Sequence, residues 1–564
     1  MKLILKLVII TIFPVAVFGQ VFTTGSLVGV VLGTDNVPLV GADVIVKHVP
    51  SGTTSGTSTR IDGSFDVPNL KIGGPYSLTV SHIGYSPEER SGINLSIGEN
   101  LKVNVALAAV AIQMTALDVV AHQNVNKTGA GTQLSEENIN NMPTVERGMY
   151  DIARLDPYVV EGLSGEINIA GRHPNYNTVK IDGAVLNDVF GLADNGLPGD
   201  QAGTQPISLD AIEELQVSVS PFDVRQNGFT GGAINAVTRS GTNEFGASAY
   251  MYTTNESFIG DYVEEDGTKN EYPEFFESVF GVRTGGPIIE DKLHYFVSLE
   301  SSKKTSPNTV TLEPGKAQSY DPVTPIDIVR VDSALTNIYG INTGGTSAIT
   351  YETPSLKLLA KLDYNISDKH RMSFRHNLVS ATDDINNRGT YYYYFGNSGY
   401  VFNHKQNSSM LHLYSTLNNK TSNEFTFGYT TIRDYRDEQT PGIPTLVIGS
   451  GSTGYVVAGA EQYSIGNKLD QNILQMSDNF TYYANKHTLS AGFSLERYSF
   501  VNGFFRNFNG FYEFDNDSLL SKGVASHYEL TYSANENNPQ PFIKWNSTLL
   551  GFYVQDNWEV HSKL

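Results

Sequence analysis

From Phe245 onward one pattern recurs along the chain, and it restricts the possible folds more than any other feature. Apolar and polar residues alternate with a period of two, which is the signature of a β-strand with one apolar face. About ten such strands can be counted, each long enough to cross a bilayer at the usual tilt. The clearest of them lie at residues 293–300, 356–364, 371–375, 424–430 and 489–496.

The connectors between these strands alternate strictly between short and long. A soluble sandwich gives no reason for this alternation, whereas outer-membrane barrels have short periplasmic turns and long outer loops. The sequence therefore predicts part of an antiparallel transmembrane β-barrel over residues 244–564. The short turns fall near residues 289–292, 367–370, 418–423 and 485–487, and the long connectors are 261–276, 304–353, 381–406, 434–470 and 502–545.

Composition narrows the class of protein. After the first residues no apolar run is long enough to cross a bilayer as a helix, and a mean hydropathy of −0.22 suits strands that are only half apolar. The 31 Tyr and 28 Phe suit aromatic girdles, although a large secreted β-protein would carry them too. A net charge of −21 argues against a nucleic-acid partner. Because cysteine is absent, disulfides, thiolate metal sites, cysteine nucleophiles and a lipoprotein anchor are excluded.

The N-terminus predicts a secretory signal peptide over residues 1–19. Lys2 and Lys6 supply positive charge, residues 3–17 are mostly apolar, and the segment ends at Gly19. We therefore expect an exported protein whose mature chain begins at Gln20.

Residues 20–110 predict a β-sandwich, because short β-rich runs alternate there with Gly, Pro and Asn. The expected strands are 27–32, 42–48, 64–67, 76–82, 93–95 and 101–107. The segment 38–44, then Thr59, Gly63 and Phe65, then 74–78 and 84–85 resemble the carboxypeptidase-regulatory-like, prealbumin-like domain. The resemblance implies a carbohydrate-binding-like fold without peptidase chemistry.

Residues 134–243 predict a small α/β domain. A helix begins at Ser135 and is interrupted by Pro143. After Asn175 and Asn177 a strand ends in an Asp182–Gly183 turn. Ser208 is expected to cap a helix over 209–215 that runs into a strand over 216–219. Finally Gly231 and Gly232 lead into a strand over 234–239.

This ordered series of motifs, together with segments 280–300 and 551–558, resembles the TonB-dependent outer-membrane receptors, particularly the Oar-like branch. The resemblance implies that residues 134–243 are a plug inside the barrel. It also implies that segment 111–133 contains a TonB box, a short strand that pairs with the periplasmic energy-coupling protein. A last sandwich strand followed by a linker is the alternative for this segment. The implied coupling residues are Leu117, Asp118, Val119 and Val120, and the implied plug residues are Asn175, Asn177, Asp182, Gly183, Gly231 and Gly232.

The number of strands suggests that the barrel is incomplete. A barrel of about eight strands is filled by its own side chains, and plugged transporters need about twenty-two. The chain also ends at Leu564, where family barrels end on an aromatic residue. We therefore expect an N-terminal part of a longer receptor that by itself neither closes nor transports.

Other chemistries find little support. Residues 449–454 match GxGxxG, but no convincing helix follows, so we do not predict nucleotide binding. The histidines form no zinc-peptidase motif. Acidic clusters at 264–266 and 515–517 could hold Ca²⁺, but solvated loop charge is the simpler interpretation. The aromatic run 391–395 fits either a ligand entrance or a girdle. No catalytic residue, metal or cofactor is predicted.

The sequence thus predicts a mainly β protein of the Gram-negative outer membrane with a periplasmic N-terminal domain. We expect it to take up an unidentified ligand. Its expected partners are the TonB energy-coupling protein, membrane lipid and the ligand, with a surface lipoprotein as a further candidate and no nucleic acid. A surface adhesin or carbohydrate-binding protein is the alternative, and an enzyme has the least support.

Overall fold

The computed structural model describes residues 22–560 apart from 110–129, 145, 163–165, 220, 222, 227, 264–266, 268, 273, 309, 311–322, 390 and 450–453. The expected signal peptide and the Leu117–Val120 segment lie outside the described residues. The described chain is mostly β-strand, which confirms the predicted fold class. None of its described helices is long and apolar enough to cross a bilayer.

The N-terminal domain is a sandwich of two sheets around an apolar core. One sheet places β1 (Gly25–Leu32) between β4 (Ser64–Leu70) and β7 (Asn100–Lys102), with β8 (Val105–Ala106) also on β1. The other has the order β3 (Thr54–Ser58), β2 (Asp43–His48), β5 (Gly73–Ser81) and β6 (Glu88–Leu95). The polar strand β3 was not predicted. The core includes Leu27, Val31, Val44, Val46, Phe65, Leu78, Val80, Leu95 and Leu101.

A five-stranded sheet forms the middle of the molecule, in the order β13 (Ala184–Val185), β12 (Thr178–Ile181), β15 (Gly232–Thr238), β14 (Ile212–Val219) and β9 (Ala130–Ser135). As predicted, Ser135 begins a helix, α2 (Glu136–Asn141). A capping box with Asn138 closes its first turn. Short elements surround the sheet: α3 (Met149–Ala153), β10 (Val159–Glu161), β11 (Ile167–Ile169), η1 (Pro174–Tyr176), η2 (Asp200–Ala202) and η3 (Leu209–Ala211).

The helix predicted over 209–215 is wrong. Only Leu209–Ala211 forms a 3₁₀ turn, and the strand β14 already begins at Ile212. β14 pairs on one side with β9 and on the other with β15. Two ladders of hydrogen bonds, together with its β-branched residues, favour the strand over the local helix signal.

Ten antiparallel strands form one curved wall, as the sequence predicted. Their order is β16 (Gly246–Asn255), β19 (Phe276–Ile289), β20 (Leu293–Pro307), β21 (Thr350–Ser367), β22 (His370–Ile385), β24 (Tyr400–Asn418), β25 (Thr421–Glu438), β28 (Lys468–Ala484), β29 (His487–Gly503) and β32 (Ile543–Trp558). The four predicted short turns are confirmed at 290–292, 368–369, 419–420 and 485–486.

The long connectors fold together into a small sheet of their own, which was not predicted. Its order is β23 (Tyr392–Tyr394), β27 (Tyr455–Ala458), β26 (Thr445–Gly449), β30 (Phe511–Phe514) and β31 (His527–Glu529). It shares an apolar core with α4 (Pro325–Tyr339) and α5 (Asp517–Lys522). Tyr393 and Phe395 lie in that core, so the girdle interpretation of 391–395 is wrong. The connector 256–275 holds η4 (Glu256–Phe258), β17 (Tyr262–Val263) and β18 (Lys269–Asn270).

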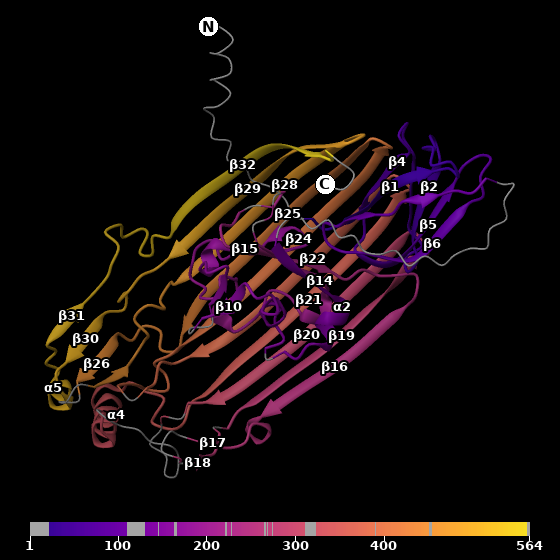
Figure 1. Ribbon diagram of the computed structural model, residues 1–564. Helices are drawn as coiled ribbons and strands as arrows, with labels where there is room; N and C mark the ends of the chain where they lie inside the picture. Colours follow the sequence, from indigo (N-terminus) through magenta and orange to yellow (C-terminus); the bar gives the residue numbers. More distant parts are fainter. Residues whose placement is uncertain are drawn as a thin grey trace, which may run out of the picture.

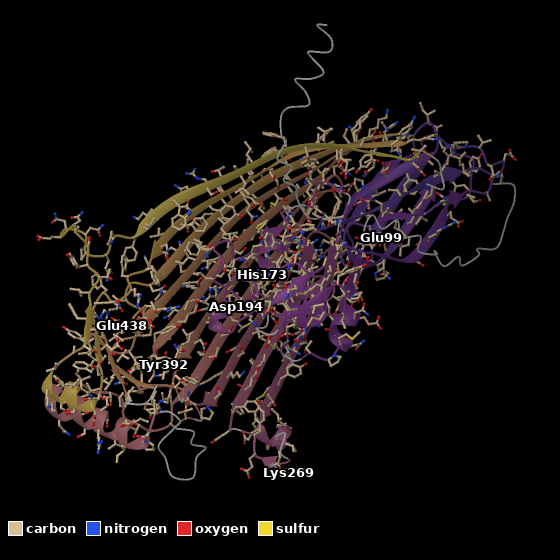
Figure 2. The ribbon with its side chains drawn as sticks, turned by 60° about the vertical axis from the view of Figure 1, so that its left-hand side comes forward. Glu99, His173, Asp194, Lys269, Tyr392 and Glu438 are labelled. Carbon is tan, nitrogen blue, oxygen red and sulfur yellow. The ribbon has the colours of Figure 1, made fainter. Side chains whose placement is uncertain are left out.

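The wall curves around the five-stranded sheet, and the other two bodies lie at its opposite ends (Figure 1). The sandwich lies at the end of the short turns, where β4 contacts β24 and β25. Tyr392 and Glu438 mark the far end with the long connectors, and His173 and Asp194 of the plug lie between the two ends (Figure 2). We call the five-stranded body the plug.

Candidate functional site: the junction of plug, wall and sandwich

The paired glycines of the plug are packed against Asn177. The Asn177 side chain accepts a hydrogen bond from Gly232 N at 3.1 Å and donates one to Ile167 O at 3.1 Å. A Cβ on Gly231 would lie 2.1 Å from Asn177 Oδ1, and one on Gly232 would lie 2.3 Å from the Ile169 side chain. Glycine is therefore required at both positions by close packing. Asn175, in contrast, is exposed in η1 and does not join this cluster.

The Asp182–Gly183 turn joins β12 to β13 and attaches the plug to the wall. Both residues have positive φ, at 45° and 77°, as a tight hairpin turn requires. The Asp182 carboxylate accepts hydrogen bonds from Thr238 N at 2.9 Å and Thr238 Oγ1 at 2.6 Å. Arg375 of β22 pairs with this carboxylate at 3.3 Å, and the His412 ring contacts Asp182 O at 3.0 Å.

Charge compensates for the burial of this turn. Lys361 Nζ of β21 donates to Thr238 O at 2.8 Å, beside the Asp182 carboxylate. Burial raises the pKa of Asp182, but Lys361, Arg375 and the Thr238 hydrogen bonds outweigh it, so this pKa lies below its ordinary value. Asp182 is therefore an ionised group that links the plug to two wall strands.

Much of the remaining contact between plug and wall is also polar, although Phe190 and Ala202 of the plug pack on apolar wall residues. Ser208, predicted as a helix cap, instead donates to Glu300 of β20 at 2.8 Å. Glu300 also accepts hydrogen bonds from Lys357 and from Tyr250. Further bonds join Thr204 to Ser355, Asn377 to Pro206 O, Val185 N to Gln475 and Val224 N to Gln555. The inward faces of the wall strands supply these partners, which explains why many of their buried residues are polar.

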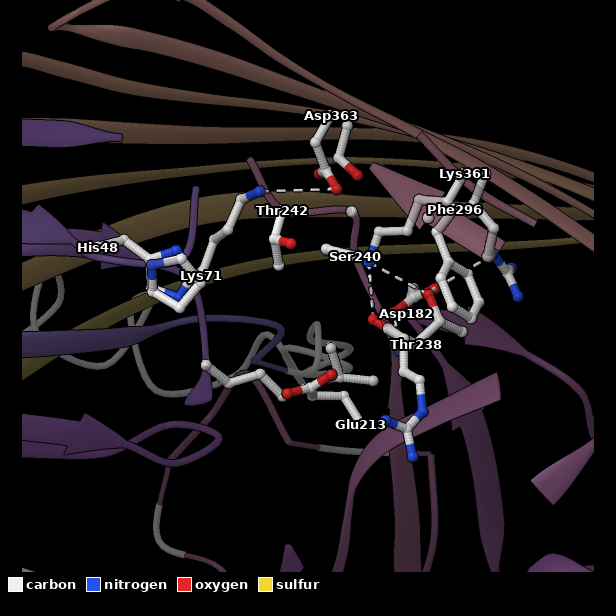
Figure 3. A pocket seen from close by; sticks show the side chains of 18 of the residues that line it. His48, Lys71, Asp182, Glu213, Thr238, Ser240, Thr242, Phe296, Lys361 and Asp363 are labelled. Carbon is white, nitrogen blue, oxygen red and sulfur yellow. Dashed lines mark hydrogen bonds and ion pairs between the residues drawn. The ribbon is translucent and has the colours of Figure 1, made fainter. Parts of the chain in front are cut away.

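A cavity of about 440 Å³ lies where plug, wall and sandwich meet (Figure 3). The plug lines it with Asp182, Glu213 and Thr238, and the wall with Lys361 and Asp363. The sandwich contributes His48 and Lys71. Lys71 Nζ forms an ion pair with Asp363 Oδ2 at 3.6 Å, and both side chains are buried.

The two sandwich groups at this cavity have shifted pKa values. Burial lowers the pKa of Lys71 to about 8, although Asp363 acts in the opposite direction. Burial, and then the nearby cations Lys71 and Arg371, lower the pKa of His48 to about 3. His48 is therefore neutral at pH 7, and its Nδ1 lies 2.7 Å from Ser51 Oγ.

A second cavity of about 630 Å³ opens on plug loops toward the long connectors. The neighbouring η2 fixes this end, because Ala202 packs on Ala381, Tyr400 and Phe402 near the outer ends of β22 and β24. Several carboxylates line the cavity, and Arg154 pairs there with Asp151 and Glu161. The carboxylates around it are Glu146, Asp151, Glu161, Asp194 and Asp200.

The structure also tests the chemistries that the sequence raised. Gly449 ends β26 and β27 begins at Tyr455, so the GxGxxG segment joins two antiparallel strands and no helix follows it. Asn516 caps α5, and Asp517 pairs with Arg330 at 3.9 Å. Two residues of the acidic cluster at 515–517 therefore have structural contacts. Within the described ranges no group of three or more acidic or histidine residues could hold a metal. The cluster at 264–266 lies outside them.

An open wall with short turns at one end, long connectors at the other and a plug inside defines a plugged outer-membrane β-barrel protein. Residues 237–564, more than half of the chain, match the family described as an outer membrane beta barrel domain, and the chain belongs to that family. Residues 26–108 match the carboxypeptidase regulatory-like domain, as the sequence motifs predicted.

Individual relatives narrow the family. The chain is 26% identical over 353 residues to the TonB-dependent transporter Oar of Myxococcus xanthus, covering 59% of this chain and 31% of Oar. It is 24% identical over 200 residues to the probable TonB-dependent siderophore receptor PirA of Acinetobacter baumannii, covering 33% of this chain and 24% of PirA. The outer membrane transporter YddB of Escherichia coli superposes with a TM-score of 0.55 at 14% identity, over 77% of this chain and 54% of YddB.

The chain therefore spans about a third or less of these curated relatives and about half of YddB. It is a homologue of TonB-dependent transporters and a Gram-negative outer-membrane protein. The relatives are transporters and receptors rather than enzymes.

Proposed function

We propose that this protein is a TonB-dependent receptor that takes up a ligand across the outer membrane with energy coupled from the inner membrane. The observation that carries the proposal is the plug, which hydrogen bonds and ion pairs hold inside the curved wall. Much of this contact is polar, and water can replace polar contacts one by one as the plug moves. The plug can then shift while the wall stays folded.

In this proposal the segment that binds the energy-coupling protein is Leu117–Val120, which precedes β9 in the chain. Among the described strands, β9 is the edge of the plug sheet and pairs with β14. A pull on the preceding segment therefore reaches the plug sheet first at this edge strand. The segment would bind the energy-coupling protein as an added strand, through backbone hydrogen bonds.

The ligand would enter from the side of the long connectors and meet the plug at the acidic outer cavity. A surface lipoprotein, if one takes part, would contact the small sheet that these connectors form. The position of the sandwich supports import over adhesion. It lies at the short-turn end, which is periplasmic in outer-membrane barrels, and so it would not face the cell exterior.

Single cysteines test the coupling step, because this chain has none of its own. Asp118→Cys, in the protein expressed from its own gene, should cross-link to a cysteine introduced in the periplasmic part of the coupling protein. Adding Val119→Pro should abolish the cross-link, because proline removes a backbone donor that an added strand needs. Asn126→Pro in the same segment is the control and should leave it intact.

A growth assay then tests whether the coupling segment is needed for uptake. Under nutrient limitation Val119→Pro should behave like a deletion of the gene, and Asn126→Pro like the wild type. The proposal fails if Val119→Pro cross-links and grows like the wild type.

A further inference from the structure

One loop of the sandwich lies across the plug. The loop 96–99 joins β6 to β7, and Ile97 is only 1% exposed. Its side chain packs with Ile72, Phe22 and the plug residue Val237 of β15. An apolar side chain at a loop tip is normally in water, so the plug accounts for its burial.

Both backbone polar groups of Ile97 also bind the plug. Ile97 N donates to Glu214 Oε1 of β14 at 2.9 Å, and Ile97 O accepts from Gln133 Nε2 of β9 at 3.0 Å. With the Val237 contact, a single residue thus touches β9, β14 and β15. These three strands are neighbours in the plug sheet, and β9 is its edge.

The sandwich is itself attached to the wall around this loop. Lys71 pairs with Asp363, and Asn243 N donates to Pro50 O at 2.7 Å just before the first wall strand. Arg371 donates to Asn69 O at 3.0 Å. On the plug side, the Arg225 guanidinium lies 4.2 Å from the centre of the Phe22 ring.

We propose that the sandwich is a latch, whose Ile97 loop fastens β9 to β14 and β15 and holds the plug closed until the sandwich undocks. The latch gives this domain a function that does not require a ligand of its own. While Ile97 is docked, β9 cannot leave β14 without also losing the Gln133 bond. In the sequence, segment 110–129 joins the sandwich to β9.

Hydrogen exchange tests the latch without a ligand or a coupling protein, so its outcome is independent of the proposed uptake. The protein in native outer-membrane vesicles is compared with Ile97→Asp, and amide exchange is followed by mass spectrometry. The buried carboxylate should undock the loop, so that amides of β9 and β14 exchange at least about tenfold faster. Ile83→Asp is the matched control, because Ile83 is 95% exposed in the turn between β5 and β6. It should leave the plug unchanged.

A reversible tether provides the second measurement. A Cβ on Gly52 would lie 2.6 Å from Cγ of Asp291, so the sandwich and the wall approach each other closely there. A cysteine pair at these two positions is the tether, and formation of the disulfide is verified before exchange is measured. In the Ile97→Asp background the disulfide should restore the protection of β9 and β14, and reduction should remove it again. If Ile97→Asp acted only by loosening the sandwich core, closing the disulfide would not restore the protection of β9 and β14.

Three results would overturn the latch. In the first, residues 96–99 lose protection in Ile97→Asp while β9 and β14 keep theirs. In the second, residues 96–99 stay protected, so that docking does not depend on Ile97. In the third, the closed disulfide fails to restore β9 and β14.

Discussion

The sandwich and the wall share one sequence pattern and use it in opposite ways. In β2 the apolar Val44 and Val46 are fully buried, while Asp43 and Lys47 are exposed. In β20 the buried positions include His294, Ser298 and Glu300, while Leu293, Tyr295, Val297 and Leu299 point outward. A period of two therefore says that a strand has two different faces, but not which face is inside.

The difference follows from what each outer face meets. The sandwich has water outside, so its apolar face turns inward. The wall has lipid outside and a polar plug inside, so its apolar face turns outward and its buried polar groups find partners on the plug. The same substitution should consequently have opposite effects in the two regions.

The largest effect is expected in the sandwich core. Phe65→Ala removes a ring that is 1% exposed and leaves a cavity, so it should lower the free energy of unfolding of the sandwich by about 3–5 kcal/mol. Denaturant-dependent hydrogen exchange of β2 and β5 measures this. Ile61→Ala is the control, because Ile61 is 86% exposed and should change the value by less than about 0.5 kcal/mol.

The contact between plug and wall should depend on charge instead. Asp182→Asn leaves Arg375 buried without its carboxylate, which should weaken the hold on the plug by about 3 kcal/mol. Exchange of the β15 amides should accelerate accordingly. Adding Arg375→Met should recover part of the loss, because it removes the cation that pairs directly with this carboxylate, while Lys361 keeps its hydrogen bonds to Thr238. If the double variant is as unprotected as the single one, the ion pair does not hold the plug.

A third effect should depend on depth in the membrane. Phe427→Arg places a cation on the lipid face near the middle of β25 and should cost about 2–4 kcal/mol on folding into lipid vesicles. Tyr435→Arg lies on the same face of the same strand, near its long-connector end, and should cost about 0–1 kcal/mol. Equal costs at both positions would mean that this face does not meet lipid.

Features with a local signal were predicted well. The wall strands and the four short turns follow from alternation and from turn residues, both of which are local. The Asp182–Gly183 turn was predicted for the same reason. The inward charges Lys357, Lys361 and Arg375 were visible as the polar half of the alternation, although the sequence could not say that they meet the plug.

Features that join distant segments were missed. The small outer sheet takes its strands from three long connectors, and no connector alone supplies more than two of them. The ion pair between Lys71 and Asp363 joins two bodies that are far apart in the sequence. The helix expected after Ser208 failed because pairing with β9 and β15 outweighed a local signal. The boundaries of the predicted segments and the coupling role of Leu117–Val120 stay predictions.

The smallest expected effect concerns pH, and it distinguishes docking of the sandwich from its folding. The pKa of His48 is about 3 in the docked sandwich and about 6.5 in an exposed chain. The docked state therefore favours neutral His48. The free energy of docking is unaffected by His48 above about pH 6.5. As the pH falls from 6.5 toward 3, protonation of His48 increasingly opposes docking, by at most about 2 kcal/mol at pH 5. The groups that face His48 are Lys71 of the sandwich and His294, Asp363 and Arg371 of the wall.

The expected result is that Ile97 exchanges faster at pH 5 than at pH 7, after correction for the intrinsic rate, while β2 and β5 change less. His48→Gln cannot gain a proton and should remove this pH dependence. His82→Gln, at the opposite end of the sandwich, should keep it. If His48→Gln responds to acid like the wild type, His48 does not control docking, and the titrating group must be sought among the carboxylates around the junction.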